Sequence, residues 1–286
     1  MPANLDIVVV GCINSDLVSF VSRLPSAGET VFSSTLESHF GGKGANQAAQ
    51  VALLQRGRSA CRGVTHECAF GASQQVSDTA TFEKRIAKVI VSENGVPGSV
   101  SVECFRIAKK ANAGVLTVFT PAPVDSVDPE ICCFTDFLLC NSIEAKALVN
   151  MWDGRMAVNE TEDEECMARR LHEVLLRTAS RFPEGARGSA NVVITRGAHP
   201  CVIFANGKAM KVPLAKQVPS ELVVDTTGAG DSFAGSFAYF LLQNPNSPEA
   251  AVTKATFVAA QSVTKRGAAE SYAGRDELPD HLFQPS

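Results

Sequence analysis

The chain has 286 residues, of which 45% are hydrophobic and 20% are charged. This is enough apolar material for one large domain with a small appendage, but not for two full domains. The net charge of −4 and the scattered Lys and Arg residues provide no basic field for nucleic acid or an anionic membrane surface. An anionic ligand would therefore have to be held by local geometry.

The start of the chain, residues 1–12, has no basic segment followed by a long apolar core, so it predicts a first strand rather than a signal peptide. No apolar run approaches the length of a transmembrane helix. The nine cysteines have no regular spacing and several lie inside apolar runs, which favours reduced thiols in a cytoplasmic protein. Cys61, His66 and Cys68 match no standard zinc spacing and lack a fourth ligand, so we assign no metal to them.

Apolar runs and helical patterns alternate along the first half of the chain. Residues 6–12 form a short apolar run that is typical of a buried parallel strand. Residues 29–40 alternate more loosely, as in a strand or hairpin exposed on one face. The Ala-rich stretch 43–54 predicts a helix packed close to a sheet or a ligand. The runs at 114–123 and 135–141 predict further strands that end in turn residues.

The second half continues this alternation. Thr161 precedes Glu164 at capping-box spacing, and apolar residues then recur at helical intervals, which predicts a helix. Two paired strands follow, the second with an Asn-Gly turn at 206–207, and two helices end the chain. These elements are expected over 161–182, 191–197, 201–213, 231–243 and 248–267.

Strands that alternate with helices predict a three-layer α/β/α sandwich with a mainly parallel central sheet and a small, incomplete β lid, all in a single α/β domain over 1–286. Ligands bind such sheets at the carboxyl ends of the strands. The turns that follow apolar runs belong at this edge, and they lie at 11–16, 120–123, 140–144, 195–200 and 225–231.

The stretch 223–237, VVDTTGAGDSFAGSF, places Asp231 where a strand passes through a Gly-Ala-Gly turn into a helix. The unpaired N–H groups and the positive dipole end of a helix start favour anions. Asp231 is therefore either a capping residue or a general base held beside an anion-binding turn. The stretch alone leaves both interpretations open.

Four motifs carry a family resemblance: GCINSD at 11–16, GGKGANQAA at 41–49, CNSIEA at 140–145 and DTTGAGDSF at 225–233. The glycine-rich stretches have neither Walker A nor dinucleotide-fingerprint spacing, which leaves a dinucleotide oxidoreductase as a weak alternative. Together and in this order, the motifs resemble the ribokinase-like carbohydrate kinase family. The second motif, with Lys43 and Gln47, is similar to that of the members that phosphorylate ribose. The resemblance covers roughly the first 54 residues and about 71–275.

The resemblance implies transfer of the γ-phosphoryl group of Mg-ATP to the 5-hydroxyl of D-ribose, giving ribose 5-phosphate and ADP. Asp231 would be the base, beside an anion hole built from the N–H groups of Ala229, Gly230 and Asp231. Gly228 and Gly230 would be glycines because a Cβ would crowd the phosphate. The sugar would be bound by Asn14, Asp16, Gly42, Lys43, Asn46 and Asp231.

The resemblance also implies nucleotide and cation sites. The residues that match the family's nucleotide site are Asn141, Thr195, Arg196, Gly197, Gly230 and Thr256. Asn141 and Glu144 match its N-x-x-E motif, which organises Mg²⁺ through water, although this spacing is also that of a capping box and both roles are compatible. An activating monovalent cation, K⁺, would bind mainly backbone carbonyls in loops that contain Asp225, Thr227, Ser262, Lys265, Gly267 and Ser271.

The stretch 55–70 departs from the family. It has no clean periodicity, and the segment after it resembles the part of the family that follows the lid, so a few dozen residues are missing. The residual β lid is expected at 17–40. Either the protein has diverged here or the stretch reflects an altered reading frame or splice junction. Because paired lids often form the family's dimer interface, a short lid argues against a stable homodimer and favours poor sugar closure with a higher KM.

Two site positions also differ from the family. Its sugar-binding Glu, two residues before a proline, falls on Gly95 when Pro97 is aligned, with Glu93 nearby as a substitute. Its Asn before Pro-Ala-Pro is Thr120 here. These departures leave three functions open: an active ribose kinase, a nearly inactive relative that still binds nucleotide or sugar, and a kinase for another furanose or ketose such as deoxyribose.

Overall fold

The computed structural model describes residues 6–55, 62–63, 87–153, 163–182 and 187–284. The strands of its main sheet are β1 (Ile7–Gly11), β4 (Arg62–Gly63), β5 (Val89–Glu93), β6 (Leu116–Thr120), β7 (Phe137–Asn141), β8 (Asn191–Arg196), β9 (His199–Ala205) and β10 (Lys208–Val212). Their order across the sheet is β10-β9-β8-β7-β6-β5-β1-β4. Neighbours from β4 to β8 pair in parallel, whereas β9 is antiparallel to β8 and β10.

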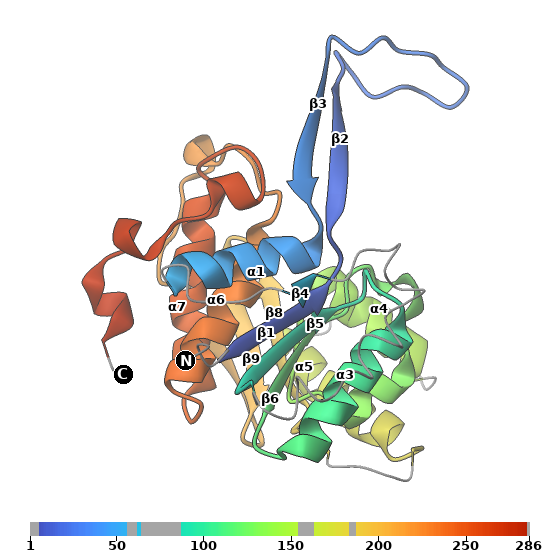
Figure 1. Cartoon of the computed structure of the whole chain (residues 1–286), viewed down its shortest axis with the longest axis vertical. Coiled ribbons are helices and arrows are strands. Elements are labelled where there is room, and N and C mark those ends of the chain that lie inside the picture. Colours follow the sequence, from blue (N-terminus) through green and yellow to red (C-terminus); the bar gives the residue numbers. More distant parts are fainter. Residues whose placement is uncertain (1–5, 56–61, 64–86, 154–162, 183–186, 285–286) are drawn as a thin grey trace.

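Helices cover both faces of this sheet (Figure 1). The helices are α1 (Lys43–Leu54), α3 (Gly98–Ala111), α4 (Ser142–Trp152), α5 (Glu164–Ala179), α6 (Ala229–Gln243) and α7 (Pro248–Ser262). Short 3₁₀ turns occupy Val124–Ser126, Pro129–Cys133, Ser220–Leu222, Ala269–Ser271, Arg275–Glu277 and Asp280–Phe283. One face carries α3, α4 and α5, and the other carries α1, α6 and α7, which confirms the predicted three-layer α/β/α sandwich.

Strand β1 illustrates why the strands of this sheet are apolar throughout rather than alternating. Val8 and Val10 pack into the core beneath α3, α4 and α5, whereas Ile7 and Val9 pack into the core beneath α1, α6 and α7. All of β1 is buried. A parallel sheet with both faces covered needs apolar side chains on both, as the run at 6–12 predicted.

Helix α6 packs against both α1 and α7, and all its residues from Ser232 to Leu241 are buried. Its contact with α1 depends on a glycine, since a Cβ on Gly235 would lie 2.5 Å from the carbonyl oxygen of Gln47. The two helices can therefore approach closely. This approach brings the start of α6 to the start of α1, where the glycine-rich motif lies.

Several boundaries differ from the sequence prediction, and the helix expected over 248–267 ends at Ser262. Helix α5 begins at Glu164 with Asp163 as its N-cap residue, and Thr161 lies outside the described residues. The strand expected from residue 29 begins only at Thr35. The strand expected over 201–213 is two strands, β9 and β10, joined at the predicted turn, where Asn206 and Gly207 both have positive φ.

Most of the stretch 55–70 lies outside the described residues, as do Cys61, His66 and Cys68. Arg62 and Gly63 are described, and they pair in parallel with the end of β1. None of the described helices combines the length and the apolarity that a membrane span requires.

A second, two-stranded sheet projects from the body of the protein (Figure 1). It consists of β2 (Asn14–Phe20) and β3 (Thr35–Gly41), which pair antiparallel from Asn14 opposite Gly41 to Phe20 opposite Thr35. We call these strands and their connection the β2–β3 hairpin. Within the described part of the chain, no further strand joins this sheet.

Candidate active site

Asp231 is the third residue of α6, directly after the glycine-rich turn. Gly228 is the N-cap residue of this helix and has left-handed backbone angles, φ 74° and ψ −2°. The Tyr272 hydroxyl donates to the Gly228 carbonyl over 2.8 Å, and a Cβ on Gly228 would lie 2.6 Å from this hydroxyl oxygen. Glycine is therefore required here by backbone conformation and by Tyr272, whatever ligand binds. Around Gly230, by contrast, a Cβ would meet no atom of another described segment within 4 Å.

The N–H groups of the turn are not equivalent. That of Ala229 donates to the Thr226 carbonyl over 3.2 Å, so it already has an acceptor in the protein and is not free for an anion. Those of Gly230 and Asp231 lie in the first helical turn, where no intrahelical acceptor precedes them. The turn therefore offers an anion two N–H groups, rather than the three that the resemblance implies.

The carboxylate of Asp231 is held from α1. Asn46 Nδ2 donates to Oδ2 over 3.1 Å, and Gln47 Nε2 donates to Oδ1 over 3.1 Å. Burial raises the pKa of Asp231 above its ordinary value, against the hydrogen bond from Asn46, the charge of Lys43 and the hydrogen bond from Gln47, which lower it. A partly buried carboxylate with a raised pKa is suited to accept a proton.

A cavity of about 180 Å³ opens in front of this carboxylate. It brings together residues that the motifs place far apart in the chain, and its lining includes Lys43, Thr120, Asn141, Glu144, Thr195, Gly228, Gly230 and Asp231. They come from the ends of β6, β7 and β8 and from the starts of α1, α4 and α6. The cavity therefore lies at the carboxyl edge of the parallel strands, as predicted.

Asn141 and Glu144 form the capping box that their spacing predicted. Asn141 Oδ1 accepts the N–H groups of Ile143 and Glu144, each over 2.9 Å, and Glu144 Oε2 accepts the N–H of Asn141 over 2.9 Å. Both residues also line the cavity. The capping box thus uses Asn141 Oδ1 and Glu144 Oε2 as acceptors of three backbone N–H groups. Glu144 Oε1 is the carboxylate oxygen that it does not use.

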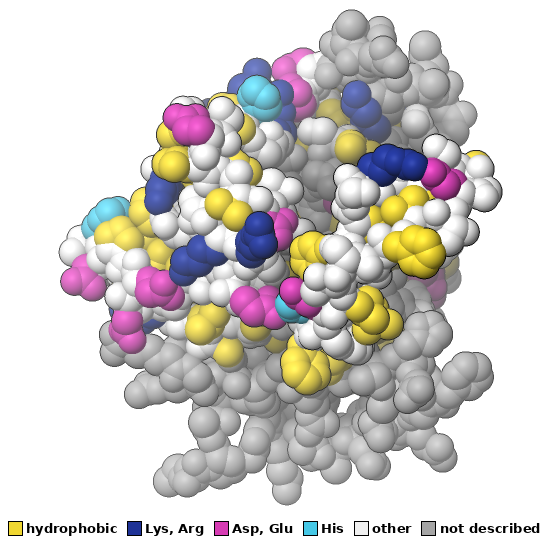
Figure 2. Space-filling model, turned by 90° about the horizontal axis from the view of Figure 1, so that it is seen from above, with side chains coloured by type: hydrophobic (Ala, Val, Ile, Leu, Met, Phe, Trp, Pro, Cys, Tyr) yellow, Lys and Arg dark blue, Asp and Glu magenta, His cyan; other side chains and the backbone are white. Residues whose placement is uncertain are grey.

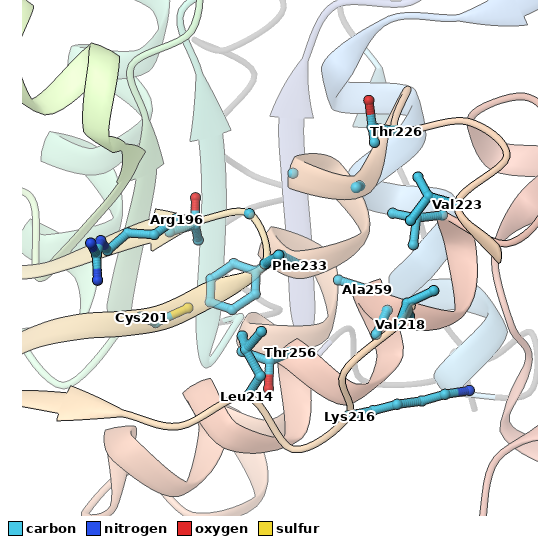
Figure 3. Close-up of a pocket in the computed structure, with 17 residues that line it drawn as sticks. Arg196, Cys201, Leu214, Lys216, Val218, Val223, Thr226, Phe233, Thr256 and Ala259 are labelled. Atoms are coloured by element: carbon cyan, nitrogen blue, oxygen red, sulfur yellow. The ribbon is translucent and has the colours of Figure 1, made fainter. Parts of the chain in front are cut away.

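A second cavity, of about 400 Å³, adjoins the first (Figure 3). Thr195, Gly230 and Phe233 line both cavities. The walls of the second are mainly apolar, and those labelled in Figure 3 include Leu214, Val218, Val223, Phe233 and Ala259. Such a pocket is suited to a flat heterocyclic base whose polar part reaches toward the first cavity.

Three residues that the resemblance assigns to the nucleotide line this second cavity in different ways. The Thr256 hydroxyl accepts the Ala215 N–H over 3.1 Å and donates to the Thr253 carbonyl over 2.7 Å, so its proton is already used and one lone pair is left to accept. Arg196 pairs with Glu164 over 2.5 Å, and its guanidinium extends away from the other lining side chains (Figure 3). Gly197 lies in the turn after β8 with φ 57°.

The loops expected to bind a monovalent cation meet at Asp225. Its Oδ1 accepts the Thr227 N–H over 2.9 Å and its Oδ2 accepts the Gly267 N–H over 3.0 Å. These bonds lower the pKa of Asp225. Lys265 pairs with Glu277 over 3.1 Å. The hydroxyls of Ser262 and Ser271 donate to local carbonyls, so neither hydroxyl hydrogen bonds across the two loops.

Asn14 and Asp16 lie apart from the two cavities, at the base of the β2–β3 hairpin. Both are exposed and neither lines a cavity described above. Asp16 pairs with His39 across the hairpin, and a Cβ on Gly41 would lie 1.9 Å from Asp16 Oδ2. His39 Nδ1 lies 3.8 Å from Glu270 Oε1, so this face of the hairpin is directed toward the loop after α7.

Glu93 ends β5 and is fully buried. Its carboxylate accepts the Cys12 N–H over 2.5 Å and also the Gly95 N–H. Burial raises the pKa of Glu93, and the charge of Asp231 raises it further. A Cβ on Gly95 would lie 2.6 Å from Glu93 Oε2. When Pro97 is aligned, the family's sugar-binding glutamate falls on Gly95. The carboxylate of Glu93 lies beside this position, and the missing side chain of Gly95 leaves room for it.

Two residues of the site were not assigned a role from the sequence. Gln47 follows Asn46 in the second motif, and the helical geometry that places both against Asp231 depends on how α1 meets α6. Tyr272 lies 44 residues from Gly228, and no local pattern connects them. The polar character of Gln47 inside the second motif was a signal that could have found its role, whereas nothing in the motifs points to Tyr272.

Comparisons with known proteins agree with this geometry. The family model for pfkB family carbohydrate kinases matches residues 86–273. The chain is 32% identical to a ribokinase of Mus musculus, covering 97% of this chain and 94% of the relative. It is 25% identical to a deoxyribokinase of Salmonella typhi, covering 97% and 99%. The crystal structure of ribokinase from Thermotoga maritima superposes with a TM-score of 0.74 at 25% identity, covering 96% and 97%.

The alignment with the mouse relative spans 330 positions, although this chain has only 286 residues. The relative therefore carries a few dozen residues that have no counterpart here. Because the family model covers more than half of the chain and the mouse relative nearly all of it, the chain belongs to the pfkB family of carbohydrate kinases, which transfer a phosphoryl group to a sugar hydroxyl.

Proposed function

We propose that the protein transfers the γ-phosphoryl group of Mg-ATP to the 5-hydroxyl of D-ribose. One observation carries this proposal: the Asp231 carboxylate lines the smaller cavity at a helix start, held by Asn46 and Gln47, next to Gly230, which lines both cavities. A sugar hydroxyl in the smaller cavity and a phosphate chain that passes Gly230 can therefore meet at this carboxylate. The ribokinase relatives support ribose as the acceptor.

In the proposed reaction, the 5-hydroxyl oxygen attacks the γ-phosphorus and its proton passes to an Asp231 carboxylate oxygen. The new oxygen–phosphorus bond forms as the bond from the γ-phosphorus to the β,γ-bridging oxygen breaks, and ADP leaves with the bonding electrons. Phosphoryl transfer depends on positioning and on charge stabilisation. The N–H groups of Gly230 and Asp231, at the positive end of α6, would stabilise the transferred group.

For the sugar, we propose that Lys43 and Asn46 bind hydroxyls from the body of the protein while Asn14 and Asp16 bind them from the base of the hairpin, next to Gly42. One carboxylate can accept hydrogen bonds from two adjacent hydroxyls, as Asp16 would from a ribose. The hairpin would have to approach the cavity to do so. Closure of a lid of this kind excludes water from the reaction.

For the nucleotide, we propose that the base occupies the apolar cavity near Thr256, whose hydroxyl proton is already donated and whose remaining polar capacity is as an acceptor. The phosphates would pass Thr195, Gly197 and Gly230 into the smaller cavity. Since the Arg196 guanidinium pairs with Glu164, we assign to Arg196 a role in shaping the turn after β8 rather than in binding phosphate.

The residues around Glu144 fit a magnesium ion that accompanies ATP. Only one carboxylate oxygen is left by the capping box, which suits an ion that keeps several waters and contacts the nucleotide's phosphates. No three His, Cys, Asp or Glu side chains gather as ligands among the residues described, which also agrees with binding through water and phosphate. Mg²⁺ would neutralise charge on the phosphates, and Asn141 and Glu144 would orient its waters.

A monovalent cation such as K⁺ is the second ion that we propose. Both oxygens of Asp225 are taken by backbone N–H groups, so the ion would be bound by backbone carbonyls of the loops around Asp225, Thr227, Ser262, Lys265, Gly267 and Ser271. The buried cysteines Cys12, Cys104, Cys132, Cys133, Cys140 and Cys201 are free thiols, which fits a reducing compartment, and we propose the cytoplasm.

A kinase for 2-deoxyribose is the second candidate, favoured by the similarity to a deoxyribokinase. The two sugars differ by the 2-hydroxyl, so a site built to bind that hydroxyl discriminates strongly against deoxyribose. A nearly inactive relative that only binds nucleotide or sugar is the third candidate, motivated by the two-stranded hairpin.

The first experiment measures ADP release with Mg-ATP in the presence and absence of D-ribose and of 2-deoxyribose, and identifies the sugar phosphate. Asp231→Asn should abolish the sugar-dependent part. Asp128→Asn is the matched control, because Asp128 caps a 3₁₀ turn and lines neither cavity. A higher kcat/KM for deoxyribose would replace the sugar assignment. Nucleotide binding without sugar-dependent turnover in folded protein would favour the binding-only relative.

A further inference from the structure

We infer that Gln47 is a positioning residue for the general base, an inference that rests on the proposed role of Asp231. Gln47 is 1% exposed and lies near the start of α1. Its Nε2 donates to Asp231 Oδ1 over 3.1 Å and to Thr120 Oγ1 over 3.2 Å. A single buried amide therefore connects the carboxylate to the end of β6.

The two contacts use the two N–H bonds of one amide nitrogen, one for each acceptor. Thr120 is the last residue of β6 and Asp231 is near the start of α6, so Gln47 fixes the carboxylate relative to the sheet. Asn46, the preceding residue, donates to the other carboxylate oxygen over 3.1 Å. Both oxygens of the base are thus held from one turn of α1, which limits rotation of the carboxylate.

The other end of the Gln47 amide has no partner. Gln47 Oε1 is buried and accepts no hydrogen bond from any described residue. A buried polar atom without a partner lowers stability. Turning the amide over would leave the carboxylate facing an oxygen, which repels it. The orientation of Gln47 therefore serves Asp231 rather than the packing of the core.

Gln50 provides the contrast. It lies one turn later on α1 and is fully buried. Its Nε2 donates to the Ala273 carbonyl over 3.2 Å, and its Oε1 accepts the Ser232 hydroxyl over 2.8 Å. Both ends of this amide are satisfied and neither contacts the Asp231 carboxylate. Both glutamines of α1 contact α6. Gln50 has the contacts of a structural residue, whereas Gln47 has the contacts of a residue that orients the base.

The test compares Gln47→Met with Gln50→Met, since methionine keeps the length of glutamine and removes the amide. Gln47→Met should lower kcat about 10- to 100-fold and change the KM for the sugar by less than about 3-fold, because the base is misplaced while the sugar contacts remain. The acid limb of the kcat/KM profile should move up by about one pH unit, since a donor to the carboxylate is lost. Gln50→Met should lower the melting temperature and leave the acid limb in place.

A second variant covers a failure to fold. Gln47→Glu is nearly isosteric and places a like charge beside Asp231, so its acid limb should lie higher than that of Gln47→Met. If folded Gln47 variants keep the wild-type kcat and acid limb, the inference is wrong. Asp231→Asn separates this result from the proposed function: turnover that survives in Asp231→Asn overturns the base itself, whereas turnover lost there and retained in the Gln47 variants overturns only the positioning role.

Discussion

The Tyr272 hydroxyl donates a hydrogen bond to the Gly228 carbonyl over 2.8 Å, which connects the loop after α7 to the first residue of the turn before Asp231. Gly228 in turn accepts the Ser232 N–H through this carbonyl over 2.8 Å. Tyr272 is 4% exposed. The buried Tyr272 hydroxyl therefore helps to fix the glycine-rich turn. The conformation of this turn depends on a loop outside the four motifs.

Tyr272→Phe tests this dependence. Loss of a buried donor to a backbone carbonyl should lower stability by about 1 kcal/mol and lower kcat more than it changes nucleotide affinity, because the turn is less well ordered. Tyr239→Phe is the matched control. Tyr239 is the only other tyrosine, and its hydroxyl accepts from Arg275 over 3.0 Å at the opposite end of α6. Equal kcat values for the two variants, measured with saturating substrates, would contradict a role for Tyr272 in the turn.

The pH dependence of activity follows from Asp231. Its pKa is raised by burial, and a base must be unprotonated to act, so activity should fall with decreasing pH through an apparent pKa above the ordinary value of 3.8. Stability has the opposite sign: because the folded form binds the proton more tightly than the unfolded chain, this group favours folding as the pH falls through the raised pKa.

The measurement is kcat/KM from pH 4 to 8 with folding monitored at each pH. Glu93 also has a raised pKa, so Glu93→Gln shows which carboxyl causes the acid limb. We expect the limb to persist in Glu93→Gln. Its disappearance in that variant would assign the titration to Glu93 instead.

The layers and the edge of the sheet that carries the site could be predicted because they depend on local patterns. The run at 6–12 is apolar on both faces, which requires helices on both faces, and the turns after such runs collect at one edge. The capping box of Asn141 and Glu144 was likewise readable from a spacing of three residues.

Other features depend on contacts between distant segments. That the N–H of Ala229 is already engaged, that Arg196 pairs with Glu164, and that Tyr272 reaches Gly228 follow from how loops are packed. The reason for Gly228 illustrates the difference: the sequence pointed to space for a phosphate, whereas the left-handed backbone and the Tyr272 hydroxyl already require glycine.

The buried pair of Lys109 and Asp136 connects α3 to the residue before β7, at the edge of the sheet opposite the candidate active site. Their side chains are 4% and 3% exposed, and Lys109 Nζ contacts the carboxylate and donates to the Val115 carbonyl over 2.8 Å. Lys109→Met should lower the free energy of unfolding by roughly 3–5 kcal/mol, because Asp136 is left as a buried unpaired charge. Lys110→Met, at the exposed neighbouring position, should change it by less than about 0.5 kcal/mol. Urea denaturation measures both, and similar values would contradict the prediction.

One face of the β2–β3 hairpin exposes three large apolar side chains, and Val18 and Phe20 lie on the other face. Asn14 and Asp16 share that other face, whereas the register places Leu17, Leu36 and Phe40 on the first, where they are 71%, 63% and 87% exposed. Hydrophobic side chains are visible on the surface viewed from the hairpin's end (Figure 2). Apolar surface of this kind favours association with a second copy, but two short strands provide far less than the ~1,600 Å² of a stable interface.

We therefore predict weak self-association through this face rather than a stable homodimer. Sedimentation velocity should give a monomer at low concentration and a mass that increases at high concentration. The double substitution Leu36→Ser and Phe40→Ser should abolish the increase, whereas Leu24→Ser, at an exposed position outside both strands, should not. A concentration-independent dimer would mean that other residues complete the interface, and a monomer at every concentration would contradict the prediction.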